Sequence, residues 1–220
     1  MDKSTWSPER IATWKSGKGF LFCLAVLSLL GGATWIFFVK GLYLLPEKMC
    51  DGALKRSAVT QILPHSRSAN DGSNRRGTGD DFSSSCYVTT SNDSSISGQA
   101  DIRPLSKDKW LESYQSGGRD NRIVHVSVQG IEAVAQLDPE DIAAGVYVPC
   151  VPRVAPSYNA SEVYAVIAEV GVAGDTKVTG AALRQALTDI AYRLTERAYE
   201  LAECKDPRDF PKELPHYEED

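Results

Sequence analysis

The stretch "TGAALRQALTDIAYRLTERAYELAEC", residues 179–204, is predicted to form a long amphipathic helix. Its apolar residues recur at steps of three or four, the spacing of one helix face. They are Leu183, Leu187, Ile190, Leu194, Ala198 and Leu201. Thr179 stands where an N-cap residue accepts hydrogen bonds from the first free backbone amides. Because the apolar stripe is narrow and lined with alanines, we expect the helix to lie flat on a β-sheet.

The residues just before this helix predict a central strand of that sheet. They read "SEVYAVIAEVGVAG", residues 161–174, and apolar side chains alternate onto both faces. Val163, Ala165 and Ile167 fall on one face, and Tyr164, Val166 and Ala168 fall on the other. A strand that is apolar on both faces is typical of the interior of a sheet.

Other segments predict further strands and one short helix. "CYVTTSNDSSISGQADI", residues 86–102, indicates a β-hairpin around Ser91-Asn92-Asp93, whose side chains favour turns. Residues 122–129 predict a half-buried strand, and residues 145–152 a short strand broken by prolines. "CDGALKRSAVTQILP", residues 50–64, predicts a short amphipathic helix that Pro64 ends. The predicted fold class is therefore α+β, a small antiparallel sheet packed by a long C-terminal helix.

Two segments are poor in apolar residues and are predicted to lack regular structure. Residues 65–85 are rich in Ser, Gly, Asn and Asp, which predicts a mobile loop. Arg75-Arg76 within it are interpreted as solvated side chains. Residues 206–220, "DPRDFPKELPHYEED", predict an acidic flexible tail. The acidic run 138–141 is interpreted as the start of a short helix that ends at Gly145, in preference to a calcium site.

The N-terminal part predicts a membrane anchor. From Phe20 to Val39 there are 20 residues without a formal charge. At about 1.5 Å per residue, a helix of that length crosses a hydrocarbon layer roughly 30 Å thick. We therefore expect a transmembrane helix over residues 20–41, after a short segment 1–19. The alternatives are a cleaved signal peptide and a buried core helix. Ser28 and Gly32 form a small-residue pair that favours helix packing, and the oligomeric state stays open.

The cysteines indicate the orientation of this anchor. Basic residues are nearly balanced on its two sides and do not decide the orientation. Cys50, Cys86, Cys150 and Cys204 all follow the predicted span, and an even set of cysteines is typical of an oxidising compartment. We expect a single-pass protein of the plasma membrane, with residues 1–19 in the cytoplasm and residues 42–205 outside. Four reduced thiols in a cytosolic domain are the alternative.

Four cysteines permit three disulfide pairings. The pairing of Cys50 with Cys86 and of Cys150 with Cys204 joins neighbours in the sequence. It closes the loop 65–85 and fastens the long helix to the sheet, so it is the favoured hypothesis among the three. A zinc site is not expected, because no CxxC motif or histidine partner has the spacing of metal ligands.

The sequence contains no recognisable catalytic or nucleic-acid-binding motif. His65, His125 and His216 are scattered and none has a partner of defined spacing. G-x-S-x-G, H-E-x-x-H and the phosphate-loop pattern do not occur. The formal net charge of −5 argues against a nucleic-acid surface. No catalytic residue, metal or cofactor is therefore expected.

Four short stretches resemble a known group of proteins. They are Cys50-Asp51-Gly52 after the predicted span, Cys86-Tyr87-Val88, Val148-Pro149-Cys150 and Ala202-Glu203-Cys204. In these cysteine placements the chain resembles uncharacterised single-pass cell-envelope membrane proteins of actinobacteria. The resemblance implies one N-terminal span followed by a small α+β domain, and it implies no activity.

The functional hypothesis is a membrane-anchored extracytoplasmic domain that binds without catalysis. Its expected partners are the lipid bilayer and an envelope protein or a wall component. The alternative is an envelope hydrolase, which must bring a nucleophile, a base and oxyanion donors together in one cleft.

Overall fold

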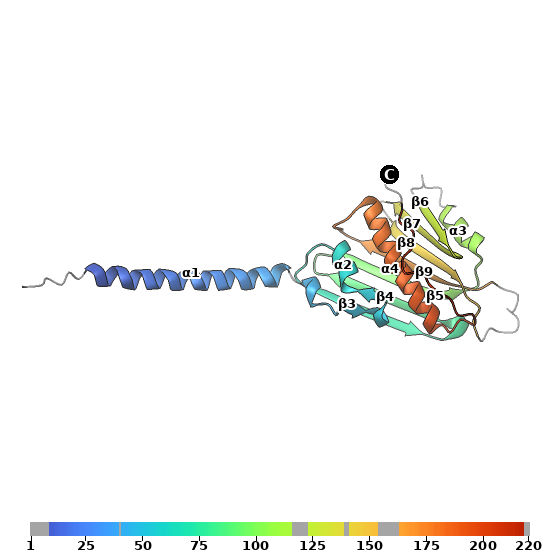
Figure 1. Cartoon of the computed structure of the whole chain (residues 1–220), viewed down its shortest axis with the longest axis horizontal. Coiled ribbons are helices and arrows are strands. Elements are labelled where there is room, and N and C mark those ends of the chain that lie inside the picture. Colours follow the sequence, from blue (N-terminus) through green and yellow to red (C-terminus); the bar gives the residue numbers. More distant parts are fainter. Residues whose placement is uncertain (1–8, 40, 116–122, 139–140, 154–162, 218–220) are drawn as a thin grey trace, which may run out of the picture.

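The structure is a computed structural model that describes residues 9–39, 41–115, 123–138, 141–153 and 163–217. A helix, α1 (Glu9–Val39), precedes an α+β domain and extends away from it (Figure 1). Every residue from 19 to 34 of α1 is exposed to solvent. Among the described residues, no helix combines the length and apolar character needed for a membrane crossing, so the predicted span over 20–41 is not supported by the structure.

The domain is built on a seven-stranded antiparallel sheet in the order β3-β4-β5-β9-β8-β7-β6. The strands are β3 (Ala69–Arg76), β4 (Ser83–Thr90), β5 (Ser95–Arg103), β6 (Ile123–Val128), β7 (Ile131–Asp138), β8 (Asp141–Pro149) and β9 (Ala165–Ala173). β9 is the middle strand, with three strands on each side, as its two apolar faces predict. The predicted α+β class with an antiparallel sheet is confirmed.

The long helix α4 (Gly180–Leu201) lies across one face of this sheet (Figure 1). It packs against β5, β7, β8 and β9, and its apolar stripe forms much of the core. Leu183, Leu187 and Ile190 are at most 3% exposed. The predicted helix is confirmed, and Thr179 occupies the N-cap position. Its side chain makes no capping hydrogen bond, which corrects that part of the prediction.

A second helix, α3 (Lys107–Gln115), covers part of the opposite face and was not predicted. Trp110 is 1% exposed and packs with Val134, Tyr147 and Ile167 in a small separate core. Gly145 of β8 lies under the Trp110 and Tyr114 rings, because a Cβ there would clash with both. Two aromatic side chains of one short helix therefore anchor it to β7, β8 and β9.

The region after α1 differs from the predicted helix over residues 50–64. A 3₁₀ turn, η1 (Gly41–Leu44), leads to a two-stranded hairpin of β1 (Lys48–Met49) and β2 (Leu54–Lys55), joined by η2 (Cys50–Gly52). Only α2 (Arg56–Ile62) is helical. Cys50 and Asp51 have φ values of 57° and 56°. This left-handed backbone does not continue into a right-handed helix, so the helix begins after the hairpin.

The prediction of a loop over residues 65–85 is wrong for most of that segment. Residues 69–76 form the edge strand β3, which pairs with β4 from Ala69↔Thr90 to Arg76↔Ser83. A turn, η3 (Gly79–Asp81), joins the two strands. The strand is held by backbone pairing with β4, and most of its side chains are exposed. Apolar burial, on which the sequence prediction relied, is therefore not the interaction that orders it.

The acidic run 138–141 does not begin a helix. Asp138 ends β7 and Asp141 begins β8, and these two residues pair across the two antiparallel strands. Gly145, the predicted helix end, lies in the middle of β8. Residues 139–140 lie outside the described residues. Strand pairing with β7 and β9 on either side thus overrides the local helix signal.

The C-terminal segment, residues 205–217, is docked on α4 and is not a flexible tail. Leu214 and Tyr217 are 3% and 8% exposed. The Phe210 ring packs between Tyr192 and Tyr199, at centroid distances of 6.0 and 5.4 Å. The Tyr192 hydroxyl also donates to the carbonyl oxygen of Pro211 at 2.6 Å. Phe210, Leu214 and Tyr217 are enough to hold the segment in place, because α4 presents aromatic partners such as Tyr192 and Tyr199.

Two disulfides join the elements at the ends of the domain. Cys50 in η2 is bonded to Cys86 in β4, and Cys150 after β8 is bonded to Cys204 after α4. These are the pairs of the favoured hypothesis. Cys23, on α1, is a free thiol.

Candidate functional site

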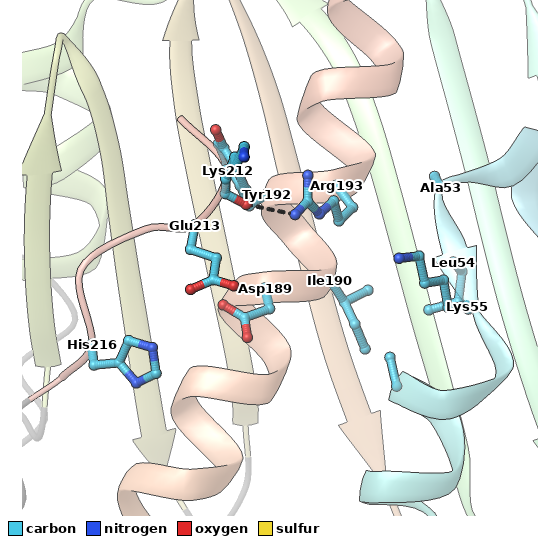
Figure 2. A pocket seen from close by; sticks show the side chains of 11 residues that line it. Ala53, Leu54, Lys55, Asp189, Ile190, Tyr192, Arg193, Lys212, Glu213 and His216 are labelled. Carbon is cyan, nitrogen blue, oxygen red and sulfur yellow. Dashed lines mark hydrogen bonds between the residues drawn. The ribbon is translucent and has the colours of Figure 1, made fainter. Parts of the chain in front are cut away.

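A groove of about 300 Å³ opens between the β2–α2 corner, α4 and the C-terminal segment (Figure 2). Three parts of the chain that are distant in sequence therefore form its walls. It is lined by Ala53, Leu54, Lys55, Ala58, Asp189, Ile190, Tyr192, Arg193, Lys212, Glu213 and His216. We call it the α4 groove.

The floor of the α4 groove is apolar. Leu54 and Ile190 are 1% and 3% exposed, and they belong to the main core of the domain. Ala53 and Ala58 pack at the edge of the same core. Small alanine side chains next to larger ones leave the hollow between α2 and α4. A ligand in this groove therefore meets a fixed apolar surface.

Charged side chains of both signs stand around this floor, and the exposed Lys212 lies on the same side as Glu213. Figure 2 shows Asp189, Glu213 and His216 on the side of the C-terminal segment and Lys55 on the side of β2. Within the described part of the chain, neither Lys55 nor Glu213 has an ion-pair partner. Both are exposed, so both are available to a ligand.

Arg193 and Tyr192 hold the wall of the groove in place. Arg193 donates to the Lys212 carbonyl oxygen at 2.6 Å and to Glu196 at 2.8 Å. Burial, with a smaller contribution from Glu196, raises the pKa of Tyr192 to about 12. The phenol therefore stays protonated at neutral pH and acts as the donor to Pro211. Its role is structural, and it does not serve as a base.

The side chains of the α4 groove are suited to binding. None of the residues that line it is Ser, Thr or Cys. His216 and the two acids therefore have no hydroxyl or thiol of a lining Ser, Thr or Cys to activate. An apolar floor flanked by three basic side chains and two carboxylates is suited to hold and orient a ligand.

The other two histidines lie outside the α4 groove. His125 on β6 faces Glu132 on β7, with Nε2 and Oε2 2.9 Å apart. Lys107 lies 3.5 Å from the other oxygen of the Glu132 carboxylate, which is buried. Within the described ranges, no serine hydroxyl hydrogen-bonds to His125. His65 is exposed outside the groove. The pairing of His125 with Glu132 depends on strand register, which residue spacing alone did not reveal.

The remaining site predictions concern metals and the two arginines. No cluster of three or more metal-ligating side chains occurs among the residues that the structure describes. Arg75 lies 3.8 Å from Asp51 in an exposed pair, which is worth at most about 1 kcal/mol. The sequence missed the α4 groove, because His216 and Glu213 belong to the segment interpreted as a flexible tail.

Comparison with known proteins found no match for this chain. No protein-family model, no curated protein and no solved structure matches it.

Proposed function

We propose that this chain is a membrane-tethered extracytoplasmic protein whose domain binds a partner in the α4 groove and catalyses no reaction. One observation carries the proposal: the groove has a buried apolar floor between charged side chains, and its lining contains no Ser, Thr or Cys. Binding needs only such a surface, whereas hydrolysis needs a nucleophile, a base and oxyanion donors in one cleft.

The partner best suited to the groove is an extended peptide segment of another envelope protein. An apolar side chain of that segment packs on Leu54 and Ile190. A neighbouring acidic group faces Lys55, and a basic group faces Asp189 and Glu213. A volume of about 300 Å³ is at the small end for ligand sites, so the groove accommodates one or two side chains. The charged side chains around the floor favour one direction of the segment.

The tether rests on the sequence of α1. Its charge-free run from Phe20 to Val39 is long enough for a bilayer. Large apolar side chains are exposed at eight closely spaced positions of this helix, and they therefore lie on all of its sides. They are Phe20, Leu21, Phe22, Leu24, Val26, Leu27, Leu29 and Leu30. Such a surface needs an apolar environment, and a bilayer provides one. The two disulfides support an oxidising compartment for the domain.

The topology is tested by labelling intact cells with a membrane-impermeant maleimide, with and without prior reduction. Mass spectrometry reads the modification at each cysteine. We expect Cys50, Cys86, Cys150 and Cys204 to be labelled only after reduction. If these four stay unlabelled on intact cells after reduction, and are labelled without reductant once the membrane is opened, the domain is cytoplasmic and the proposed location is wrong.

Binding in the groove is tested by photo-crosslinking in cells that produce the full chain. A benzophenone amino acid replaces Lys55 at the groove, or Lys109 on the exposed side of α3 as a control. We expect a discrete adduct only from position 55. Asp189→Lys should abolish that adduct, and the matched change Asp108→Lys should leave it unchanged. Equal adducts at both positions, or an adduct insensitive to Asp189→Lys, would contradict a role for the groove.

A further inference from the structure

The second feature of interest is the part of the sheet face that α3 leaves uncovered. On the face opposite α4, the helix α3 packs over β7, β8 and β9. Nothing in the described chain packs over the same face of β3, β4 and β5. We infer that this open face is a binding site for a neutral, hydroxyl-rich glycan, distinct from the α4 groove.

The strand register places polar side chains side by side on this face. Residues that are partners across neighbouring strands point to the same side of a sheet. Gly72, Tyr87 and Ser97 therefore form one row, and Asn74, Ser85 and Gln99 form the next. With strands about 4.8 Å apart, the rows make a platform of roughly 10 Å across three strands. Five of these six residues are exposed, and Gly72 is half-buried.

Tyr87 provides a flat ring in the middle of the platform. A Cβ on Gly72 would overlap the Tyr87 ring, so the ring lies over the glycine and against the sheet. Tyr87 nevertheless remains 49% exposed. The ring thus rests against the backbone of β3 at Gly72 and is about half open to solvent. An aromatic ring held in this way stacks against the apolar C–H face of a sugar ring.

The platform is electrically neutral, which argues against charged ligands. Its two central rows contain hydroxyl, amide and phenol groups and no charged side chain. Charge appears at the margins. Arg103 lies 2.9 Å from Asp101 and 3.6 Å from Glu169, and the exposed Arg76 belongs to the next row, with Ser83 and Asp101. The two arginines are matched in number by the two carboxylates. Nucleic acids and anionic lipid surfaces are bound through unpaired Lys and Arg. The charge distribution therefore favours an uncharged polymer.

A second protein molecule is a poorer occupant for the same platform. Protein–protein interfaces place apolar and aromatic side chains at their fully buried centre. Here Tyr87 is the only large apolar side chain among the six residues of the two central rows. Hydroxyl and amide groups that both donate and accept hydrogen bonds match the hydroxyl groups of sugars. Asn74 and Gln99 both lie in the row next to the ring row, and the Gln99 amide donates to Asp101 at 2.7 Å.

The test is binding of the purified full chain in detergent to glycans. The probes are insoluble chitin in a pull-down, and chitotetraose, cellotetraose and maltotetraose by isothermal titration calorimetry. We expect at least one of these to bind, and Tyr87→Ala to weaken that binding at least tenfold. Tyr87→Phe keeps the ring and should retain affinity within threefold. It therefore separates loss of stacking from loss of folding.

Matched variants complete the design. Gln99→Ala on the platform should weaken glycan binding, whereas Gln61→Ala should not, because Gln61 is an exposed residue of α2 outside the platform. Lys55→Glu in the α4 groove should leave glycan binding unchanged, so failure of the groove proposal does not affect this one. The inference is overturned if none of the four probes binds, or if Tyr87→Ala binds like the wild type. It is also overturned if sedimentation shows a dimer that Tyr87→Ala dissociates.

Discussion

Single residues decide how α1 joins the domain, and Gly41 is the clearest case. Its amide donates to the Ser66 carbonyl oxygen at 2.9 Å. A Cβ at this position would lie 2.5 Å from that oxygen and 2.6 Å from backbone atoms of Arg67 and Ser68. The Arg56 guanidinium then binds the carbonyl oxygens of Tyr43 and Leu45, each at 2.9 Å. These contacts make the connection after residue 40 short and fixed.

Gly41→Ala is therefore expected to destabilise the domain. The backbone of residues 66–68 must move to make room, at a cost of about 1–3 kcal/mol. Urea unfolding of the full chain in detergent measures this change. Gly31→Ala is the matched control, because nothing lies within 4 Å of a Cβ there. Equal unfolding midpoints for Gly41→Ala and wild type would show that the junction is not tightly packed.

Buried tyrosines predict a loss of stability at alkaline pH. Burial raises the pKa of Tyr192 to about 12, and it also raises the pKa of Tyr199 and Tyr217. The unfolded chain loses these protons near pH 10, before the folded chain does. Their stabilising contribution is therefore complete below about pH 9 and declines as the pH rises toward about 12. Urea unfolding measured across this range should show a falling midpoint, with a smaller slope for Tyr192→Phe. A midpoint independent of pH would contradict the prediction.

At the scale of elements, the C-terminal segment behaves as a strap along α4. Besides Tyr192, Tyr199 donates to the Asp206 carbonyl oxygen at 2.8 Å. Farther along, the hydroxyls of Thr188 and Tyr217 lie 2.9 Å apart. Thr188 is completely buried. The strap therefore completes the core over α4 and supplies one wall of the α4 groove.

Tyr217→Phe tests the strap without changing its apolar packing. The buried Thr188 hydroxyl loses its partner, which should cost about 1–2 kcal/mol. Tyr43→Phe is the control, since Tyr43 is 51% exposed. The readout is the free energy of unfolding from urea titration. If Tyr217→Phe matches the control, the segment contributes little to stability, and the wall of the groove is not fixed by this contact.

At the scale of the whole molecule, the two disulfides fasten the first and last elements of the domain to its sheet. The closed loops span 36 and 54 residues. In the chain-entropy description, each bond then stabilises by about 4 kcal/mol. The first joins the hairpin after η1 to β4, and the second joins α4 to the sheet. The hairpin and the C-terminal end of α4 are consequently both fastened to the seven-stranded sheet.

Removing either disulfide should lower the free energy of unfolding by a similar amount. The variants are Cys50→Ala with Cys86→Ala, and Cys150→Ala with Cys204→Ala. Each is expected to lose about 4 kcal/mol, the second slightly more because its loop is longer. Cys23→Ala should have no effect on the domain, because Cys23 is a free thiol on α1. A pair whose removal leaves the unfolding free energy unchanged would show that the bond does not constrain the unfolded chain.

Local sequence patterns predicted the helices and strands correctly wherever buried residues recur at a simple period. The apolar repeat of residues 179–204 and the two apolar faces of residues 161–174 predicted α4 and β9. The turn residues at 91–93 predicted the β4–β5 hairpin. The same patterns failed for β3, α3 and the C-terminal segment. Backbone pairing orders β3, and a few aromatic contacts with distant partners anchor α3 and the strap.

The sequence by itself determined the antiparallel α+β framework, its central strand, its long helix and the supply of four cysteines. These depend on periodic burial, which each segment encodes locally. Only the tertiary structure decided the α4 groove and the open platform. Lys55 and Glu213 line the same groove because the strap folds back over α4. Tyr87 lies over Gly72 because β3 pairs with β4 in one register. Both sites are products of long-range packing, which no single stretch of the chain encodes.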